Sequence, residues 1–369
     1  MTATADTTVR PGTDHPGTDA VCLGESMVTF LPSRPGRLAD VPSFDRTIGG
    51  AESNVACALA AVGHRVRWVG RVGADGFGDH LTEAIAAYGV DTSGVRRDPG
   101  RPTGIYFRTA TDRATDAHEV AYYRAGSAAS AMAPGNPPRA DLWTGRVLHL
   151  SGITAALSDG CLALMRELTA RAPGRPLVSF DVNHRPGLWR RPSDARVLLE
   201  LARGADLVLV GEDEAAEAWD VHGADAIRAA LPEPTTVVIK RGAAGAVLYT
   251  REPAAAAEPG TAARGPASGD TVVSVPAPRV DVVAPVGAGD AFAAGFLSAT
   301  LRGLPAAARL RHGHLMAAAA LTVPGDLGAP PSRDHADRLA ALDEAAWGTL
   351  RLGPGWTSAG ATEKEVRTP

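Results

Sequence analysis

The stretch APVGAGDAFAAGF, residues 284–296, places two glycines and an aspartate directly before a run of apolar residues. The run ends before Gly303, which predicts a helix whose first turn contains Asp290. The start of a helix is an anion site, because its first backbone N–H groups are free and the helix dipole is positive there. Gly287 and Gly289 would let a ligand approach the backbone closely.

The carboxylate of Asp290 argues against a permanently bound phosphate and for a transient one. Backbone N–H groups can meet the charge that develops during phosphoryl transfer, while a carboxylate takes the proton from the attacking hydroxyl. The residues therefore predict Asp290 as a general base and the backbone of Gly287, Ala288 and Gly289 as the anion site. The alternative interpretation is an aspartate that caps an ordinary helix.

Composition restricts the class of protein. The 369 residues suffice for one large or two medium domains, and 45% apolar with 21% charged residues is typical of a globular protein. The formal net charge of −4 gives no reason to expect nucleic acid or an anionic membrane as a partner. Cys22, Cys57 and Cys161 form no CxxC pair, which argues against a disulfide framework or a zinc site. The N-terminus has no apolar signal segment and no 18-residue apolar span follows, so we expect a cytoplasmic enzyme.

Short β-rich runs alternate with helical stretches along most of the chain. RVLHLSG, PLVSFDVN, ADLVLVGE and TTVVIKRG have strand length, and helical segments such as SDGCLALMRELTARA lie between them. This alternation predicts an α/β fold with a doubly wound, mostly parallel sheet covered by helices on both faces. Ligands in such folds bind beyond the carboxyl ends of the strands. The polar residues that follow the strands are therefore site candidates: Ser151, Asp181, Asn183, Arg185, Glu212, Glu214 and Lys240.

Residues 1–19 and 351–369 are rich in polar residues, and we expect them to be disordered tails around a domain of residues 20–350. The low-complexity segment 253–270 is predicted to be a surface loop between two strands.

Two stretches break the alternating pattern. TGIYFRTA and EVAYYRAG are β-rich and joined by the polar TDRATDAH, which predicts an antiparallel hairpin. With the early MVTFLPS, the hairpin would form a small β-sheet lid over about residues 25–45 and 100–126. Tyr122 and Arg124 would share one face of it, and Tyr123 would lie on the other.

The segment GGAESNVACALAAVGHRVRWVGRVGADGFG, residues 49–78, adds a second motif to GAGD. Together the two resemble the signatures of the ribokinase-like (PfkB) sugar kinase family, and the resemblance covers about residues 20–330. It includes KRGAAGA, residues 240–246, as the nucleotide-side loop. The resemblance implies a three-layer αβα domain with a β-sheet lid, ATP with Mg²⁺ as the phosphoryl donor, and Asp290 as the base.

Within this family, YYRAGSAAS, HLSGITAALS and FDVNHRPGLW are most similar to 2-keto-3-deoxygluconate kinases. That similarity implies a sugar site formed by Gly50, Asn54, Tyr106, Tyr122, Arg124 and Arg185. It implies a nucleotide side formed by Lys240, Gly242, Gly245, Gly287 and Gly289, with Glu214 near the Mg²⁺ ion. A sugar acid carries a carboxylate, which the planar guanidinium groups of two arginines could grip in bidentate fashion. The alternative for either arginine is a surface ion pair.

The chain departs from the family pattern at two places. Ala284 stands where the family commonly has an acidic or amide residue associated with monovalent-cation binding, so potassium dependence is not expected. Gly211 begins the sequence GEDE in place of the family's Asn-x-x-Glu, so only Glu214 is carried over.

The expected function is an ATP-dependent kinase for a sugar acid, with 2-keto-3-deoxygluconate giving its 6-phosphate. The alternatives are a kinase for a neutral sugar such as fructose or ribose, a nucleoside kinase, and a non-catalytic sugar or nucleotide sensor on the same fold. A nicotinamide oxidoreductase is disfavoured, because no complete GxGxxG follows an early strand. Ile105, Phe107, Ala121 and Tyr123 would leave one apolar face of the lid open, which predicts a homodimer formed through the lids.

Overall fold

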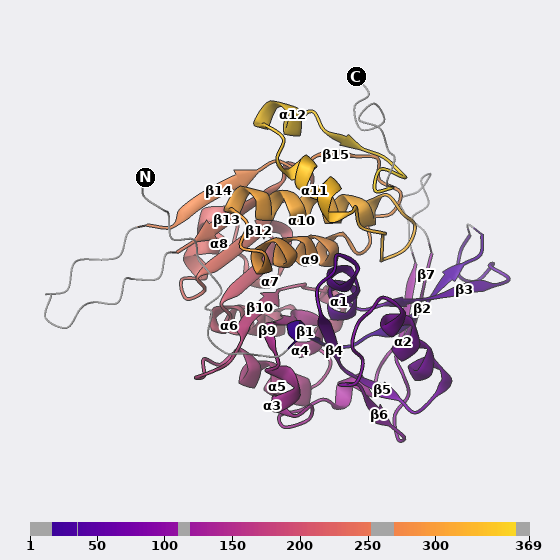
Figure 1. Cartoon of the computed structure of the whole chain (residues 1–369). Coiled ribbons are helices and arrows are strands. Elements are labelled where there is room, and N and C mark those ends of the chain that lie inside the picture. The colour runs from indigo at the N-terminus through magenta and orange to yellow at the C-terminus, as the bar shows by residue number, and fades with distance from the viewer. Residues whose placement is uncertain (1–16, 35, 110–118, 252–268, 359–369) are drawn as a thin grey trace, which may run out of the picture.

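The computed structural model describes residues 17–34, 36–109, 119–251 and 269–358. Its main sheet contains β1 (Thr18–Leu23), β4 (Val66–Val69), β9 (Gly145–Ser151), β10 (Leu177–Asp181), β11 (Leu207–Gly211), β12 (Thr236–Lys240), β13 (Ala246–Thr250) and β14 (Thr271–Val275). The order across this eight-stranded sheet is β14-β13-β12-β11-β10-β9-β1-β4 (Figure 1). The first six strands from one edge, β4, β1, β9, β10, β11 and β12, pair in parallel. β13 pairs antiparallel with both β12 and β14. The predicted mostly parallel sheet is confirmed.

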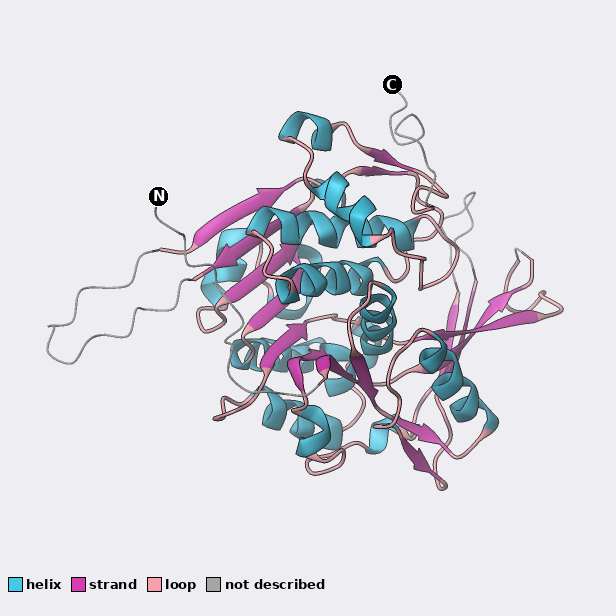
Figure 2. Cartoon of the chain, viewed as in Figure 1, coloured by secondary structure: helices cyan, strands magenta, loops and turns pink. Residues whose placement is uncertain are grey.

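Helices cover both faces of the main sheet (Figure 2). One face carries α1 (Ala51–Ala61), α2 (Gly76–Ala87), α9 (Ala288–Leu301), α10 (Ala306–Leu321), α11 (Arg333–Ala340) and α12 (Glu344–Gly348). The other carries α3 (Arg139–Leu142), α4 (Gly152–Ala155), α5 (Asp159–Thr169), α6 (Val197–Gly204), α7 (Glu212–Trp219) and α8 (Ala224–Ala230). Short 3-10 helices lie at Ala129–Ala131, Pro186–Leu188, Pro192–Arg196 and Gly242–Ala244.

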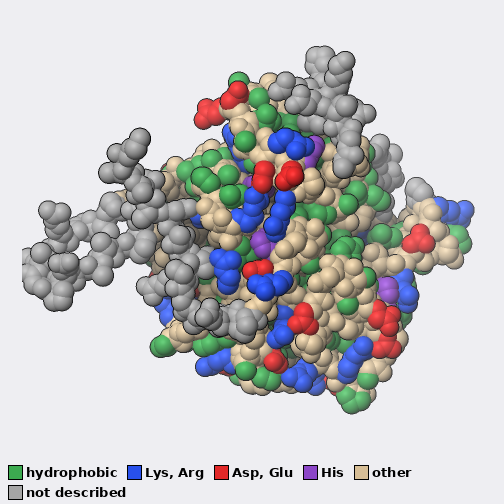
Figure 3. All heavy atoms as spheres, viewed as in Figure 1, with side chains coloured by type: hydrophobic (Ala, Val, Ile, Leu, Met, Phe, Trp, Pro, Cys, Tyr) green, Lys and Arg blue, Asp and Glu red, His purple; other side chains and the backbone are tan. Residues whose placement is uncertain are grey.

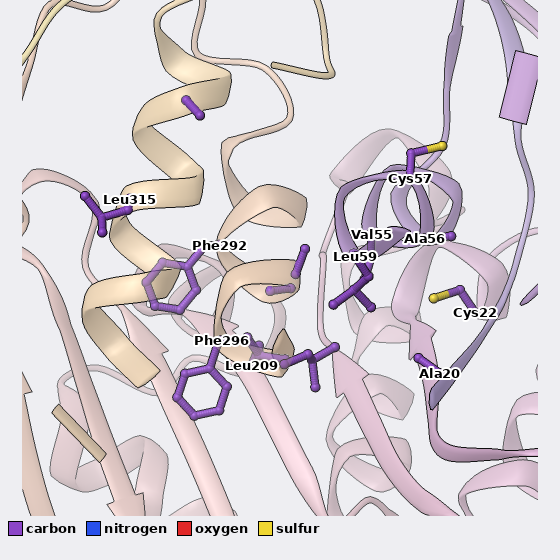
Figure 4. Close-up of a cluster of buried hydrophobic side chains, with 14 of the residues drawn as sticks. Ala20, Cys22, Val55, Ala56, Cys57, Leu59, Leu209, Phe292, Phe296 and Leu315 are labelled. Atoms are coloured by element: carbon purple, nitrogen blue, oxygen red, sulfur yellow. The ribbon is translucent and has the colours of Figure 1, made fainter. Parts of the chain in front are cut away.

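The continuous apolar run of β11 reflects burial on both sides. All five of its residues are buried, and their side chains alternate between two cores. Leu209 packs in the core with α1, α9 and α10, where Phe292, Phe296 and Leu315 also lie (Figure 4). Val208 packs in the core on the opposite face. A strand covered on both faces needs apolar residues at every position, which is why periodicity alone does not distinguish its two sides.

The lid is a separate sheet that projects from one side of the domain (Figure 1). It consists of β2 (Met27–Pro32), β3 (Phe44–Gly49), β7 (Ile105–Arg108) and β8 (Val120–Tyr123), in the order β3-β2-β7-β8. The antiparallel pairing of β7 with β8 confirms the predicted hairpin, although its turn lies outside the described residues. β2 joins β7 in parallel, and β3 adds a fourth strand that extends past residue 45.

The apolar face of the lid is partly covered by the chain itself. The Phe107 ring stacks on Phe30 with a centroid distance of 4.8 Å, and Phe77 of α2 contacts Phe30 edge-on at 5.8 Å. Tyr123 lies on the same face and remains 65% exposed. The open part of this face is therefore smaller than the alternation of residues indicates.

Two smaller strand pairs complete the fold: β5 (Arg71–Gly73) pairs with β6 (Arg96–Asp98), and β15 (Arg279–Val280) with β16 (Arg351–Leu352). The prediction of a disordered tail from residue 351 is wrong for its first part, because β16 is paired and Trp356 is buried. At the other end β1 already begins at Thr18, inside the predicted tail 1–19.

The predicted surface loop 253–270 lies almost entirely outside the described residues, but the strands that flank it, β13 and β14, pair as expected. None of the described helices is long and apolar enough to cross a membrane. On the face seen in Figure 3, acidic and basic side chains are interspersed over the described residues.

Candidate active site

The carboxyl ends of three neighbouring strands bring a lysine and two carboxylates together. Lys240 ends β12, Asp181 ends β10, and Glu214 lies in the first turn of α7, directly after β11. Lys240 Nζ lies 3.0 Å from Asp181 Oδ2 and 4.0 Å from Glu214 Oε2. Burial lowers the pKa of Lys240, but the two carboxylates outweigh it and hold that pKa well above its usual value. The ammonium group is therefore charged, and its charge is balanced within the site.

The start of α9 lies against this cluster. Gly287, the residue before the helix, adopts the left-handed conformation with φ 74°, and a Cβ there would collide with the carbonyl oxygen of Asp326. Ala288, Gly289 and Asp290 then form the first helical turn. A Cβ on Gly289 would lie 3.7 Å from the nitrogen of Lys240. The free N–H groups of this turn and a partly buried cation thus lie side by side, as an anion site requires.

Asp290 is held by two asparagine side chains. Asn54 of α1 donates a hydrogen bond to Asp290 Oδ2 at 2.8 Å, and Asn183 donates one to Oδ1 at 3.4 Å. Asn183 itself has φ 40°, an uncommon conformation that is often found at functional sites.

The surroundings of Asp290 favour its protonated form. Burial raises its pKa from 3.8 to about 7 and Asp181 adds to the rise, while the hydrogen bond from Asn54 and the charges of Arg185 and Lys240 oppose it. The residue is nevertheless partly accessible to solvent. A carboxylate that ionises near neutral pH and can be reached from outside is suited to accept a proton.

The predicted sugar-side residues come from the lid strands β7 and β8 and from segments at the adjoining edge of the domain. Gly50 precedes α1, and a Cβ there would collide with the carbonyl oxygen of Glu25. The Tyr106 hydroxyl donates to Asp326 Oδ2 at 3.1 Å, and its ring lies 5.4 Å from that of Tyr122, measured between centroids. Tyr122 is half exposed, so its ring could form one wall for a ligand.

Both predicted arginines already have carboxylate partners in this chain. Arg124 forms a close ion pair with the buried Glu25, which also accepts a hydrogen bond from Ser127 Oγ at 2.7 Å. Arg185 Nη1 lies 3.5 Å from Glu214 Oε1, and its side chain is 54% exposed. Arg124 is thus mostly buried in its ion pair, whereas Arg185 is half exposed and also donates a hydrogen bond to the His184 carbonyl oxygen at 2.8 Å.

Lys240 and Gly242, two of the predicted nucleotide-side residues, line an open pocket at this edge of the sheet. Its volume is about 520 Å³, and its lining comprises Glu212, Asp213, Ala216, His222, Gly223, Lys240, Arg241 and Gly242. Gly242 and Gly245 have φ 54° and 111°, which glycine adopts without strain. Glu212 forms an ion pair of 3.4 Å with Arg241 across the cavity wall, while Glu214 Oε2 accepts a hydrogen bond from the Gly211 N–H at 2.7 Å.

Three buried residues of the site were not predicted. Glu25 follows β1, so the rule that polar residues after strands line the site would have found it. Glu52 accepts hydrogen bonds of 2.8 Å from Ser151 Oγ and Thr154 Oγ1, and burial raises its pKa to about 6. Asp326 lies in the loop between α10 and α11, where no motif marks it.

The fold and the site define a class of protein. A model described as pfkB family carbohydrate kinase matches residues 18–333, and the chain belongs to this family, as its sequence predicted. It is 33% identical over 327 residues to 2-dehydro-3-deoxygluconokinase of Bacillus subtilis (strain 168), a match that covers 86% of this chain and 93% of that protein. This enzyme name is a synonym of 2-keto-3-deoxygluconate kinase.

Two further relatives indicate the breadth of the family. The chain is 29% identical over 284 residues to probable fructokinase-6, chloroplastic, of Arabidopsis thaliana, covering 75% of this chain and 69% of that protein. Its fold matches an uncharacterized sugar kinase from Pyrococcus horikoshii in complex with ATP, with a TM-score of 0.71 and 25% identity over 89% of this chain and 99% of that one.

The environment of Asp290 predicts a measurable titration. In ¹³C-aspartate-labelled protein, the carboxyl of Asp290 should titrate near pH 7. The hydrogen bond from Asn54 stabilises the ionised form, so its removal in Asn54→Leu should raise this pKa further. The spectrum of Asp290→Asn identifies the signal. Titration near pH 4 in the wild type, or a lower pKa in Asn54→Leu, would contradict the described environment.

Proposed function

We propose that the protein is an ATP-dependent kinase that phosphorylates a hydroxyl group of a sugar acid, with 2-keto-3-deoxygluconate, converted to its 6-phosphate, as the favoured substrate. The observation that carries the proposal is the position of Asp290, a carboxylate with a pKa of about 7 in the first turn of α9, beside free N–H groups and Lys240. The similarity to the Bacillus subtilis enzyme supports the choice of substrate.

Each part of the site has a chemical task in such a reaction. Asp290 takes the proton from the attacking hydroxyl, which increases the nucleophilicity of its oxygen. The N–H groups of Ala288 and Gly289 face the charge that develops on the transferred phosphoryl group, and Lys240 adds a positive charge beside them. Above about pH 7 Asp290 is ionised, so the base is active at and above neutrality and is lost as the pH falls.

The donor side is consistent with ATP. The cavity of about 520 Å³ lies directly beyond Lys240 and Gly242, and the Pyrococcus horikoshii sugar kinase of the same fold binds ATP. A reaction that consumes ATP is expected in the cytoplasm.

Mg²⁺ fits the donor side as an ion held by few protein ligands. Among the described residues, no group of three or more His, Cys, Asp and Glu side chains could hold a metal ion. Mg²⁺ commonly keeps several waters and binds through one or two carboxylates plus substrate phosphates. Glu214 and Asp181 would hold it in this manner, and the ion would offset the charge of the phosphates.

A kinase for a neutral sugar is the second candidate. The pairing of Arg124 with Glu25 favours it, because the cation expected to bind a substrate carboxylate is already neutralised. The similarity to a probable fructokinase points in the same direction. Arg185, which is half exposed and only loosely paired, favours the sugar acid.

Replacing the base tests the proposed reaction. Asp290→Asn should lower turnover by about 10²–10⁴-fold, the usual cost of losing a general base, and leave ATP affinity nearly unchanged. Coupled ADP release and calorimetric titration with ATP measure the two quantities. A folded variant that turns over within a few-fold of the wild type would exclude Asp290 as the base.

The arginines test the class of substrate. Arg185→Leu should weaken binding of the sugar acid about 10- to 100-fold, which corresponds to the loss of a charged hydrogen bond, and should affect neutral sugars little. Arg124→Leu should do the same. Because this substitution leaves the buried Glu25 carboxylate without its partner, it is compared with the double variant Glu25→Gln/Arg124→Leu. Equal losses on acids and on the corresponding alcohols would assign the arginines a structural role instead.

We also propose that two copies pair through their lids. Tyr123 is 65% exposed on the apolar face of the lid, where a second copy could cover it. Tyr123→Asp should convert a dimer into a monomer in sedimentation experiments, whereas Phe107→Asp would also disrupt the ring stack with Phe30. A wild-type protein that is monomeric at micromolar concentration would rule this assembly out.

A further inference from the structure

A buried ion pair connects the lid to the loop between α10 and α11. Arg108, at the end of lid strand β7, lies with Nη2 2.6 Å from Asp326 Oδ1, and Tyr106 of the same strand donates to Asp326 Oδ2 at 3.1 Å. The exposures of Arg108, Tyr106 and Asp326 are only 5, 7 and 7%. Both oxygens of the Asp326 carboxylate are therefore used by residues of the lid.

The backbone of Asp326 contacts the other half of the site. Its carbonyl oxygen occupies the space where a side chain on Gly287 would lie, so the loop packs directly on the residue that starts α9. Its carboxylate also borders Gly49, at which a Cβ would lie 2.8 Å from Oδ2 and 2.9 Å from Thr29 Oγ1. One residue thus contacts lid strand β7, Gly49 at the end of lid strand β3, and Gly287 at the start of α9.

The energetics of this pair favour a fixed geometry. Each charge loses its hydration on burial and is compensated only while the partner stays in place, so separating them is costly. If the lid strand moves, Asp326 must move with it or leave Arg108 unpaired. Because the carbonyl of Asp326 rests on Gly287, such a movement would reach the N–H groups that face the transferred phosphoryl group.

We propose that Asp326 is a positioning residue that holds the anion site at the start of α9 in a fixed position relative to the lid. The inference rests on the proposed kinase function and adds to it: the N–H groups reach their productive position only when the lid is in place. Phosphoryl transfer to water is thereby disfavoured when no sugar holds the lid closed.

The test compares Asp326→Asn with a matched control. Asp206→Asn also removes the charge of a well-paired carboxylate, since Arg175 Nη2 lies 2.8 Å from Asp206 Oδ1, but that pair lies at the amino ends of β10 and β11, away from the site. In hydrogen exchange, Asp326→Asn should speed exchange of the hydrogen-bonded amide of Ala291, which donates to the Gly287 carbonyl, and of the amides of residues 105–108, relative to the wild type and to Asp206→Asn. This comparison needs no substrate.

Kinetics provide the second readout. On the sugar that the wild type accepts, Asp326→Asn should lower kcat about 10- to 100-fold, the scale expected for misplaced reacting groups, with ATP affinity unchanged. It should also raise the amount of ADP formed per sugar phosphate. Asp206→Asn should match the wild type in both.

A double variant covers the case in which Asp326→Asn does not fold. Arg108→Met combined with Asp326→Leu leaves no unpaired buried charge, and it should show the same kinetic loss as Asp326→Asn, because the two residues act as a unit. The proposal is overturned if Asp326→Asn shows the same amide exchange, and the same amount of ADP per sugar phosphate, as Asp206→Asn. If no sugar acid is phosphorylated, the proposed substrate class fails, while the exchange comparison still decides the role of Asp326.

Discussion

Helix α9 begins directly after Gly287, which adopts φ 74° and leaves room for the carbonyl oxygen of Asp326. This contact fixes where the first free N–H groups of the helix lie, and it fixes Asp290 one turn into the helix. Asn54 and Asn183 can reach the Asp290 carboxylate only because α9 begins beside α1 and the end of β10. The anion site and the base are thus set by one close backbone approach, which no residue with a side chain would permit at position 287.

Around this point, each cation of the site faces a carboxylate of the same chain. Lys240 lies against Asp181, Arg185 against Glu214, Arg124 against Glu25, and Arg108 against Asp326. Buried charges require such partners, because an isolated charge in the protein interior is costly. An anionic substrate must therefore compete with the protein's own carboxylates. The loosely paired and half-exposed Arg185 is the cation most accessible to such competition.

Local patterns in the sequence were sufficient for the architecture, and they indicated candidate site residues that lie together in the structure. Alternating strand and helix runs predicted the sheet, and the rule about strand ends predicted Asp181, Asn183 and Lys240, because both depend on short-range periodicity. The partner of Tyr106 could not be predicted, since Asp326 is 220 residues away in an irregular loop. The pairing of Arg124 with Glu25, 99 residues apart, was missed for the same reason.

The ends of the fold show the same limit. Polar composition predicted a tail from residue 351, but β16 adds to a strand more than seventy residues earlier in the chain and brings Trp356 into the core. Such an edge pairing has no signature within the segment itself. Composition alone therefore misjudged where the folded chain ends.

The central claim, a base-assisted phosphoryl transfer from ATP to a sugar acid, is tested most directly by coupled ADP release. The assay compares 2-keto-3-deoxygluconate with its analogue in which the carboxylate is reduced to an alcohol, and with fructose and ribose, at pH 8, where Asp290 is ionised. The account predicts sustained turnover with the acid and a kcat/KM at least tenfold lower for each neutral compound. Turnover that favours fructose or ribose, or that is equal for the acid and its alcohol, would contradict it.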